Sequence, residues 1–329
     1  MAPGLALLLR ALNWVPEPER FESVVQTAPT TPHDPAAPLT VATWNLQYAG
    51  TRRHHYFYDG GPDTFPDPQN VQEALLAIRE VLASLVADGL DIALLQEIDR
   101  DSDRTARVDE LATIALGWPT YVSSSYHKSC FVPHPSPPRR PLGRVDMHQA
   151  ILARCALGPA RRLALPGLAE SPLRQSFNLH RAILSSRVPL LGGGHLHVAV
   201  THLSAFSRGD GTMRRQVAAL RAWMEACGDE PFVLGGDLNL LPPGDDPARL
   251  GPDAGEYVED VLSELAPLAQ RIPSAREHTY LPPFKDLPDR ALDHFFVSPD
   301  IRILRHRVVP VAAWLSDHWP LLTTLQLPK

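Results

Sequence analysis

Residues 232–239 read FVLGGDLN, an apolar run that ends in two polar side chains, Asp237 and Asn239. A short apolar run with glycines at its end is typical of a strand buried in the core of a sheet. The residues that follow such a strand lie at one edge of the sheet. The run therefore predicts a buried strand with a carboxylate and a carboxamide at its end.

Five further runs along the chain have the same form. They are Leu39–Trp44 ending at Asn45, Asp91–Gln96 ending at Glu97, His195–Thr201 ending at His202, Ala291–Val297 containing Asp293, and Trp314–Ser316 meeting Asp317 and His318 before Leu321–Leu327. Each run has the length and apolar content of a buried strand. We therefore expect several strands to carry acids, amides and histidines at their ends.

Helices are predicted between some of these strands. Apolar residues recur at helical spacing over residues 70–88, with Asn70 as the N-cap and Gly89 after the last turn. Residues 212–226 repeat this arrangement, and further helices are expected over residues 104–116 and 256–268. Strands mixed with flanking helices indicate an α/β sandwich rather than an all-β barrel.

The chain is predicted to form one domain, residues 39–329, preceded by a leader, residues 1–38. Leucines between Leu5 and Leu12 have helical spacing, so the leader either packs on the surface of the domain or forms a disordered tail. Long loops are expected where proline and glycine concentrate, because loops of more than about 12–15 residues in a compact domain are usually functional or disordered. These stretches are residues 50–69, 127–146 and 242–255.

The composition limits the class of protein. The 329 residues include 31 Lys and Arg against 37 Asp and Glu, a net charge of −6, and 44% are hydrophobic. A chain this apolar is not intrinsically disordered, and its acidic balance argues against a protein that coats nucleic acid by bulk charge. The 34 prolines argue against a helical bundle, because an interior proline breaks a helix.

The cysteines and the N-terminus bear on the cellular compartment. Cys130, Cys155 and Cys227 are widely spaced, which predicts neither a disulfide framework nor a zinc site. The run Gly4–Leu9 is too short to span a bilayer, and no basic residue precedes it. We expect a reduced, cytoplasmic protein without a transmembrane segment, and a degraded signal peptide is the alternative. The sequence predicts no oligomeric state.

The polar residues at the strand ends are weak signals one at a time, since such a residue is more often a cap, a turn former or a structural hydrogen-bonding group. As a set they are a stronger signal, because clustered acids without basic partners repel each other unless a cation or a proton joins them. Histidines beside them add proton-transfer groups. The pattern indicates metal-assisted attack of water on a phosphoester. The oxygen donors that suit Mg²⁺ or Mn²⁺ are Asn45, Glu97, Asp237 and Asp317.

Six short motifs follow one another along the chain: Thr43-Trp44-Asn45, Leu95-Gln96-Glu97, Thr201-His202-Leu203, Gly236-Asp237-Leu238-Asn239, Leu292-Asp293-His294-Phe295 and Ser316-Asp317-His318. This ordered set resembles the endonuclease/exonuclease/phosphatase superfamily of DNase I-like, metal-dependent phosphoesterases. The resemblance runs from about residue 39 to residue 327. It implies a four-layer α/β (α+β) sandwich, in which two packed mixed β-sheets are flanked by helices and present these motifs at one edge.

The resemblance also implies which residues hold the metal and the water. Glu97 would be the principal Mg²⁺ ligand, with Asn45 beside it and Asp317 at the metal side. Asp237 would orient or deprotonate the attacking water, and Asn239 would steady Asp237 and the phosphate.

The histidine motifs receive proton-transfer or phosphate-binding roles by the same resemblance. His318 would contact the scissile phosphate or transfer a proton, held in its tautomer by Asp293. His202 would be a second phosphate contact or a general acid for the leaving oxygen. One position departs from the family pattern Gly-x-Ala-Ile-Leu-Ser, because His148 stands in place of the glycine. His148 is therefore either a substrate contact or a structural residue.

Basic and aromatic stretches bear on the substrate. Residues 52–58, with Arg53 and His55 among aromatics, have the composition of a nucleic-acid or headgroup contact. Arg144 belongs to a locally basic stretch that would steer a phosphate. Each stretch is also compatible with a plain surface loop. We expect a nuclease first, a phospholipid or inositol phosphodiesterase or phosphatase second, and a non-catalytic binding protein on the same fold third.

Overall fold

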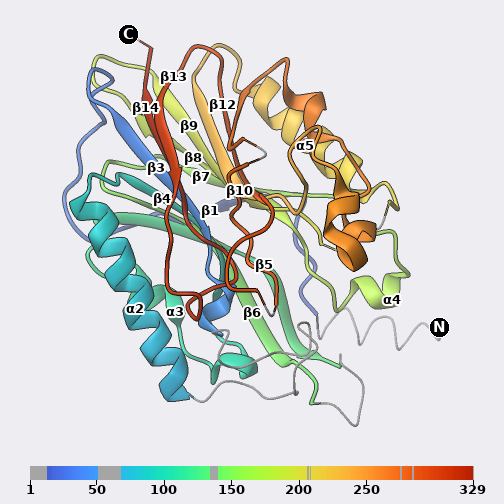
Figure 1. Ribbon diagram of the computed structural model, residues 1–329. Coiled ribbons are helices and arrows are strands. Elements are labelled where there is room, and N and C mark those ends of the chain that lie inside the picture. Colours follow the sequence, from blue (N-terminus) through green and yellow to red (C-terminus); the bar gives the residue numbers. More distant parts are fainter. Residues whose placement is uncertain are drawn as a thin grey trace.

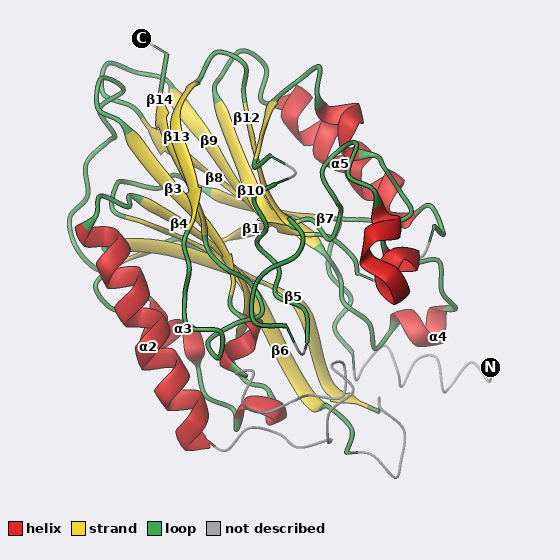
Figure 2. Cartoon of the chain, viewed as in Figure 1, coloured by secondary structure: helices red, strands yellow, loops and turns green. Residues whose placement is uncertain are grey.

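The apolar runs around the motif residues form inner strands of two sheets that stack in the middle of the molecule (Figure 1). The computed structural model describes residues 13–50, 68–133, 140–205, 207, 209–274, 276–283 and 285–328. Each sheet has seven strands within these residues. Helices lie on the two outer sides (Figure 2), so the layers run helix, sheet, sheet, helix. This confirms the predicted four-layer α/β sandwich.

One sheet, called here the β3 sheet, contains the predicted strand runs 39–44, 91–96 and 321–327. In spatial order it consists of β13 (Arg302–Val308), β14 (Leu321–Gln326), β3 (Leu39–Asn45), β4 (Ile92–Asp99), β6 (Gly143–Ala153), β5 (Thr120–Val132) and β2 (Val25–Gln26). β3 and β4 run parallel, and the other neighbours run antiparallel.

The other sheet, called here the β10 sheet, has the same mixed character. In spatial order it consists of β1 (Glu19–Glu22), β7 (Ala160–Ala164), β8 (Ala182–Pro189), β9 (His195–His202), β10 (Phe232–Asp237), β12 (Asp293–Val297) and β11 (Gln270–Ile272). β9 and β10 form its parallel pair. Strands buried on both faces lack polar alternation, which is why these runs are almost continuously apolar in the sequence.

Three apolar layers hold the sheets and helices together. Side chains such as Leu94 of β4 and Phe295 of β12 meet between the two sheets. α2 (Pro68–Ala87) and α3 (Glu110–Ile114) cover the outer face of the β3 sheet. α5 (Thr212–Ala226) covers the outer face of the β10 sheet (Figure 1). The helix predicted over residues 212–226 is confirmed.

Three helix predictions need correction. α2 begins at Pro68, so Asn70 lies inside the helix and is not its N-cap. The helix predicted over residues 104–116 shrinks to α3, because Ala106 and Arg107 take left-handed backbone conformations after the 3-10 turn η3 (Asp103–Thr105). The helix predicted over residues 256–268 is replaced by the 3-10 turns η4 (Pro247–Glu256) and η5 (Leu262–Leu265), which also occupy part of the predicted loop 242–255. Pro267 lies inside the predicted span, where a proline breaks a helix, and the buried Val261, Leu262 and Leu265 belong to the short η5 turn and its start.

The loop predicted over residues 127–146 is too long. β5 and β6 pair as a long antiparallel hairpin that includes residues 127–132 and 143–146 (Figure 1), and the loop keeps only residues 133–142, of which 134–139 lie outside the described residues. Burial alternates along residues 120–126, as in any strand with one covered face. The covered positions are Thr120, Val122, Ser124 and Tyr126, of which only Val122 is aliphatic, so the alternation does not show on a hydrophobicity scale.

Part of the predicted leader belongs to the sheets. β1 pairs with β7, and β2 pairs with β5, so residues 19–26 supply one edge strand to each sheet. Residues 5–12 lie outside the described residues, as do Arg53 and His55. The three cysteines are free thiols. Among the helices that the structure describes, including the short α4 (Pro172–Gln175) and η1 (Gln47–Ala49), none has the length and hydrophobicity needed to cross a membrane.

Candidate active site

The register of three neighbouring strands brings His202, Asp237 and Asp293 together. In the parallel β9–β10 pair Asp237 lies opposite His202, and in the antiparallel β10–β12 pair it lies opposite Asp293. His202 Nε2 is 3.2 Å from Asp237 Oδ2. The strand-end residues of three separate sequence runs are thus direct neighbours in space.

The β3 sheet contributes Asn45 and Glu97 to the same place. Asn45 Nδ2 donates to Glu97 Oε1 at 3.2 Å and to Asp237 Oδ2 at 3.0 Å. The second of these bonds joins one sheet to the other. The cluster therefore lies where the ends of β3, β4, β9 and β10 meet.

Glu97 is directed into the cluster by an irregularity in β4. The pairing of β4 with β6 changes register between Leu95 and Ile98, and Glu97 there has a φ of 56°. A bulge of this kind bends a strand and redirects a side chain. The Glu97 side chain is 20% exposed, whereas that of Asp237 is 3% exposed. Glu97 is therefore the more accessible of these two carboxylates.

The two histidines beside Asp237 differ electrostatically. His318 Nδ1 lies 2.7 Å from Asp293 Oδ2, and its Nε2 lies 3.6 Å from Asp237 Oδ2. Burial alone would lower the pKa of His318, but the carboxylates of Asp293 and Asp237 outweigh it and raise that pKa well above its usual value. Burial, followed by the nearby Arg181 charge, lowers the pKa of His202. At neutral pH the site thus pairs a charged His318 with a neutral His202.

Asn239 and Asp317 frame the cluster. The backbone N–H of Asn239 donates to Asp237 Oδ1 at 3.0 Å, and its Nδ2 donates to Leu203 O at 3.1 Å. The backbone N–H of Asp317 donates to Gln47 Oε1 at 3.1 Å. The Asp317 carboxylate also contributes to the raised pKa of His318. Both residues therefore lie beside the Asp237 cluster, and their roles stay predictions.

The predicted substrate contacts are held by other partners. Arg144 Nε lies 2.6 Å from Asp101 Oδ2. His148 Nε2 lies 3.0 Å from Asp146 Oδ1, and its Nδ1 lies 3.3 Å from Ser123 Oγ. These contacts tie both side chains to the β5–β6 hairpin and the loop after β4. Their role toward a substrate stays a prediction, as does that of Arg53 and His55.

Sequence reasoning gave no role to three residues that build the site. The Tyr126 hydroxyl contacts both the Glu97 backbone N–H and His202 Nδ1. Ser316 Oγ donates to Asn45 O at 2.7 Å and accepts from the His318 N–H at 3.0 Å. The Trp44 indole N–H donates to His318 O at 2.9 Å. No signal in the sequence indicated Tyr126, because the alternation along residues 120–126 does not show on a hydrophobicity scale.

The side chains of the cluster can be compared with the ligands that a divalent cation requires. Within the described residues, no three His, Cys, Asp or Glu side chains are grouped so as to hold a metal by themselves. Mg²⁺ does not need such a group, because it keeps several waters and takes one or two carboxylates with the substrate phosphate. The accessible Glu97 fits that mode. Asn45 turns its Nδ2 toward the acids and accepts from the Gln47 N–H through Oδ1, which suits an orienting role.

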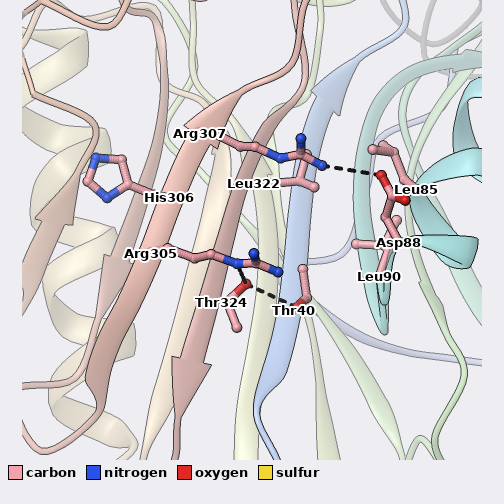
Figure 3. A pocket seen from close by; sticks show the side chains of 9 residues that line it. All are labelled: Thr40, Leu85, Asp88, Leu90, Arg305, His306, Arg307, Leu322 and Thr324. Carbon is pink, nitrogen blue, oxygen red and sulfur yellow. Dashed lines mark hydrogen bonds and ion pairs between the residues drawn. The ribbon is translucent and has the colours of Figure 1, made fainter.

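Two pockets of the described structure lie away from the lining of the Asp237 cluster. A depression of about 40 Å³ lies between β13, β14, β3 and α2, and in it Arg307 points toward Asp88 (Figure 3). Thr40 lines it, at the opposite end of β3 from Asn45. A groove of about 580 Å³ runs beside α5 on the outer face of the β10 sheet, with Phe21 and Trp223 in its lining. Neither is lined by a residue of the Asp237 cluster.

Two stacked mixed sheets that join their acids, amides and histidines at a shared edge define the DNase I-like class of phosphoesterases. A family model described as "Endonuclease/Exonuclease/phosphatase family" matches residues 42–318. The chain belongs to this family, whose members are hydrolases of phosphoester bonds and generally depend on divalent metals. A search of curated proteins found no significant match.

Solved structures share the fold. A protein of this family from Beutenbergia cavernae is 20% identical, with a TM-score of 0.56, and the match covers 88% of this chain and 72% of that one. The human nocturnin catalytic domain is 16% identical, with a TM-score of 0.54 and coverage of 92% and 96%. A mannosyl-6-phosphatase from Bacteroides thetaiotaomicron is 15% identical, with a TM-score of 0.51 and coverage of 87% and 99%. At these identities the similarity concerns the fold.

Proposed function

We propose that this chain is a Mg²⁺- or Mn²⁺-dependent hydrolase that cleaves phosphodiester bonds by attack of water. The observation that carries the proposal is the convergence on Asp237. Asn45, His202 and His318 each place a side-chain nitrogen within 3.6 Å of Asp237 Oδ2. His318 and His202 hold the pKa of Asp237 below its usual range although burial would raise it, so this group is ionised.

Each residue of the cluster has a part in the proposed reaction. Asp237 orients the attacking water, and Asn239 fixes Asp237 through its backbone N–H. Protonated His318 presents Nε2–H to a phosphate oxygen, while Asp293 holds its Nδ1–H. A positive donor beside an ionised carboxylate suits a reaction in which negative charge grows on the phosphoryl oxygens.

The proposed metal site consists of Glu97 with Asn45 beside it and Asp317 at its side. A divalent cation bound there would polarise the phosphoryl oxygen and offset the charge that develops on it. Glu97 serves as the accessible carboxylate, and Asn45 keeps that carboxylate in line with Asp237.

Nucleic acid is the first substrate that we propose. Its support is the cationic and aromatic composition of residues 52–58. The basic β5–β6 hairpin adds little to it, because Lys128 pairs with Asp146 at 3.1 Å and Arg144 pairs with Asp101 at 2.6 Å. A zebrafish TDP2 structure with the same fold holds a single-stranded DNA product, which makes single strands a sensible first test.

A lipid-headgroup or inositol phosphodiester is the second candidate, and one observation favours it. Phe131 near the end of β5 is 52% exposed, on the hairpin that extends beyond the paired ends of β3 and β4 (Figure 1). An exposed aromatic side chain on the strand that carries Tyr126 is suited to contact the apolar part of a lipid whose phosphate enters the site.

The test combines a general substrate with a specific panel. The protein is assayed on bis-p-nitrophenyl phosphate with Mg²⁺ or Mn²⁺, and then on labelled DNA, RNA, sphingomyelin and phosphoinositides. We expect His318→Ala to lower kcat by about 10²- to 10⁴-fold, and His306→Ala, an exposed histidine on β13, to leave it unchanged. Activity that survives both EDTA and His318→Ala would overturn the mechanism. If no phosphoester is cleaved and no metal binds, the chain is a non-catalytic binding protein on this fold.

A further inference from the structure

The hydroxyl of Tyr126 joins two residues of the site. Tyr126 lies in β5 and is completely buried. Its oxygen is 3.1 Å from the backbone nitrogen of Glu97 and 3.2 Å from His202 Nδ1. His202 Nδ1 is also 3.8 Å from Glu97 Oε1, which is beyond hydrogen-bond distance. Tyr126 is therefore the hydrogen-bond partner of Nδ1.

The number of hydrogens at this junction decides the tautomer of His202. A backbone N–H can only donate, so the Tyr126 oxygen accepts from Glu97, and within the described residues His202 Nδ1 is the one acceptor that the Tyr126 hydrogen reaches. Nδ1 must then be the acceptor. A neutral imidazole carries one N–H, which leaves that hydrogen on Nε2.

The other side of the ring selects the same tautomer. His202 Nε2 lies 3.2 Å from Asp237 Oδ2, and an ionised carboxylate can only accept. With the hydrogen on Nδ1, a bare nitrogen lone pair would face a carboxylate oxygen. Both contacts therefore require Nε2–H, directed at Asp237.

Packing holds this arrangement in place. The rings of Tyr126 and His202 meet edge to face, with centroids 5.7 Å apart, and the Arg181 guanidinium lies 5.3 Å from the Tyr126 ring centroid. The side chain of His202 is 3% exposed. Both of its ring nitrogens are engaged inside the protein, and neither is presented to solvent.

We propose that Tyr126 is a positioning residue that fixes His202 as an Nε2–H donor to Asp237. His202 then acts through Asp237, by holding the carboxylate that orients the water, and does not protonate the leaving oxygen. This inference rests on the proposed phosphoesterase function, and it replaces the phosphate-contact or general-acid role that the sequence resemblance implied for His202.

The first test reads the tautomer without any activity. Long-range ¹H–¹⁵N spectra of ¹⁵N-histidine-labelled protein distinguish Nε2–H from Nδ1–H, and His202→Gln identifies the His202 signals by their loss. We expect pure Nε2–H in the wild type, a mixture or a protonated ring in Tyr126→Phe, and no change in the matched control Tyr121→Phe on the same strand. An Nδ1–H signal in the wild type overturns the proposal. Because no turnover is needed, this result stands even if no phosphoester is cleaved.

The second test separates a positioning role from proton donation. In His202→Gln the amide N–H takes the place of Nε2–H, but glutamine cannot release a proton to a leaving group. We expect kcat of His202→Ala to fall about 10- to 100-fold, and that of His202→Gln to recover most of the loss. The fall should be equal for 4-nitrophenyl and alkyl leaving groups. Equal loss in both variants, and a larger loss for the alkyl diester, would establish a general acid and overturn the proposal.

A double-mutant comparison identifies the route of the Tyr126 effect. Tyr126→Phe should lower kcat about 10-fold with KM unchanged. Losses of this size are typical when a residue that hydrogen-bonds to a site residue, without touching the substrate, is replaced. In the His202→Gln background it should change nothing further, because Nδ1 is gone. A Tyr126→Phe effect that persists there would show that Tyr126 acts through the Glu97 N–H alone, against the proposal. If Tyr126→Phe does not fold, the comparison of His202→Gln with His202→Ala decides the question by itself.

Discussion

At the scale of single residues, backbone strain concentrates around the candidate site. Non-glycine residues rarely adopt positive φ, which costs about 1–3 kcal/mol each in an otherwise relaxed chain. Local hydrogen bonds offset part of this cost: the Gln47 N–H donates to Asn45 Oδ1, and Gln47 Oε1 accepts from the Asp317 N–H. Strained residues that gather around one cluster support a functional interpretation of that cluster. They are Gln47, Tyr48, Ala49, Glu97 and Asn239.

A buried acid behind the site gives a pH-dependent prediction. Glu110 is completely buried, accepts from the Asp99 N–H at 2.8 Å through Oε2, and has no hydrogen-bond partner at Oε1. Burial, and then the Asp99 charge, raise its pKa well above the usual value. A raised folded-state pKa contributes stability that is present below the unfolded pKa and is lost as pH rises through the folded pKa.

Glu110→Gln removes this titration and keeps an oxygen for the Asp99 N–H. The stability of the variant relative to the wild type should therefore increase with pH, by about 1.4 kcal/mol per pH unit between the unfolded and folded pKa values. Thermal unfolding at pH 5, 6.5 and 8 measures the difference, with the exposed Glu80→Gln as the reference. A Tm difference that stays constant over this range would contradict a raised pKa at Glu110.

The sequence predicted which residues gather at the candidate site, but not how their side chains are oriented. Asn45, Glu97, His202, Asp237 and Asp293 were recognisable because each follows or begins an apolar run. The positive φ of Glu97 could not be recognised, since it depends on where β6 loses register with β4. Long-range pairing of this kind leaves no trace in a local pattern.

At the scale of elements, glycine allows β9 and β10 to approach closely. A Cβ on Gly236 would lie 1.9 Å from the backbone oxygen of Thr201, which cannot move without breaking the parallel pair. The same pair aligns His202 with Asp237. The glycine before Asp237 is therefore required by the register that builds the site.

Gly236→Ala should lower the free energy of unfolding by about 3 kcal/mol or more, the upper range for overpacking a rigid core, and should abolish phosphoester hydrolysis. Denaturant unfolding and the substrate assay measure the two effects. Gly167→Ala is the control, because no atom lies within 4 Å of the added Cβ. A Gly236→Ala protein with normal stability would mean that β9 and β10 are farther apart than described.

The inner strands could be predicted from the sequence, whereas the β5–β6 hairpin could not, and the reason is physical. The inner strands β3, β4, β9 and β10 are buried on both faces, so their sequences are continuously apolar and easily recognised. The β5–β6 hairpin buries serine and histidine through specific hydrogen bonds, such as Ser124 Oγ to Glu22 Oε1 at 2.7 Å. Hydrophobic periodicity cannot reveal a strand whose covered face is polar.

At the scale of the whole molecule, residues 13–38 connect the two sheets. β1 pairs with β7 and β2 pairs with β5, which covers one edge of each sheet. The buried Arg162 of β7 donates to Glu17 O and stacks on Trp14 at 5.0 Å. The domain boundary predicted at residue 39 can be tested directly against this arrangement.

A fragment of residues 39–329 should be less stable than a fragment of residues 13–329 by about 3 kcal/mol, or on the order of 5 °C in Tm. It should also aggregate more readily, because uncovered strand edges pair with other chains. Calorimetry and light scattering on the two fragments measure both effects. Equal stability and solubility would support residue 39 as the start of an independent domain.

Metal binding can be measured on the whole molecule without a substrate. An ion that binds only the folded state at ten times its Kd adds about 1.4 kcal/mol of stability, roughly 2 °C in Tm for a chain of this size. The Tm of the wild type should therefore rise with Mg²⁺ or Mn²⁺ and return to its starting value with EDTA. Glu97→Gln should lose the shift, because the accessible carboxylate is gone. Glu225→Gln should keep it, because this substitution removes only an exposed ion pair with Arg221. A shift that persists in Glu97→Gln would place the ion at another site and remove Glu97 from the proposed reaction.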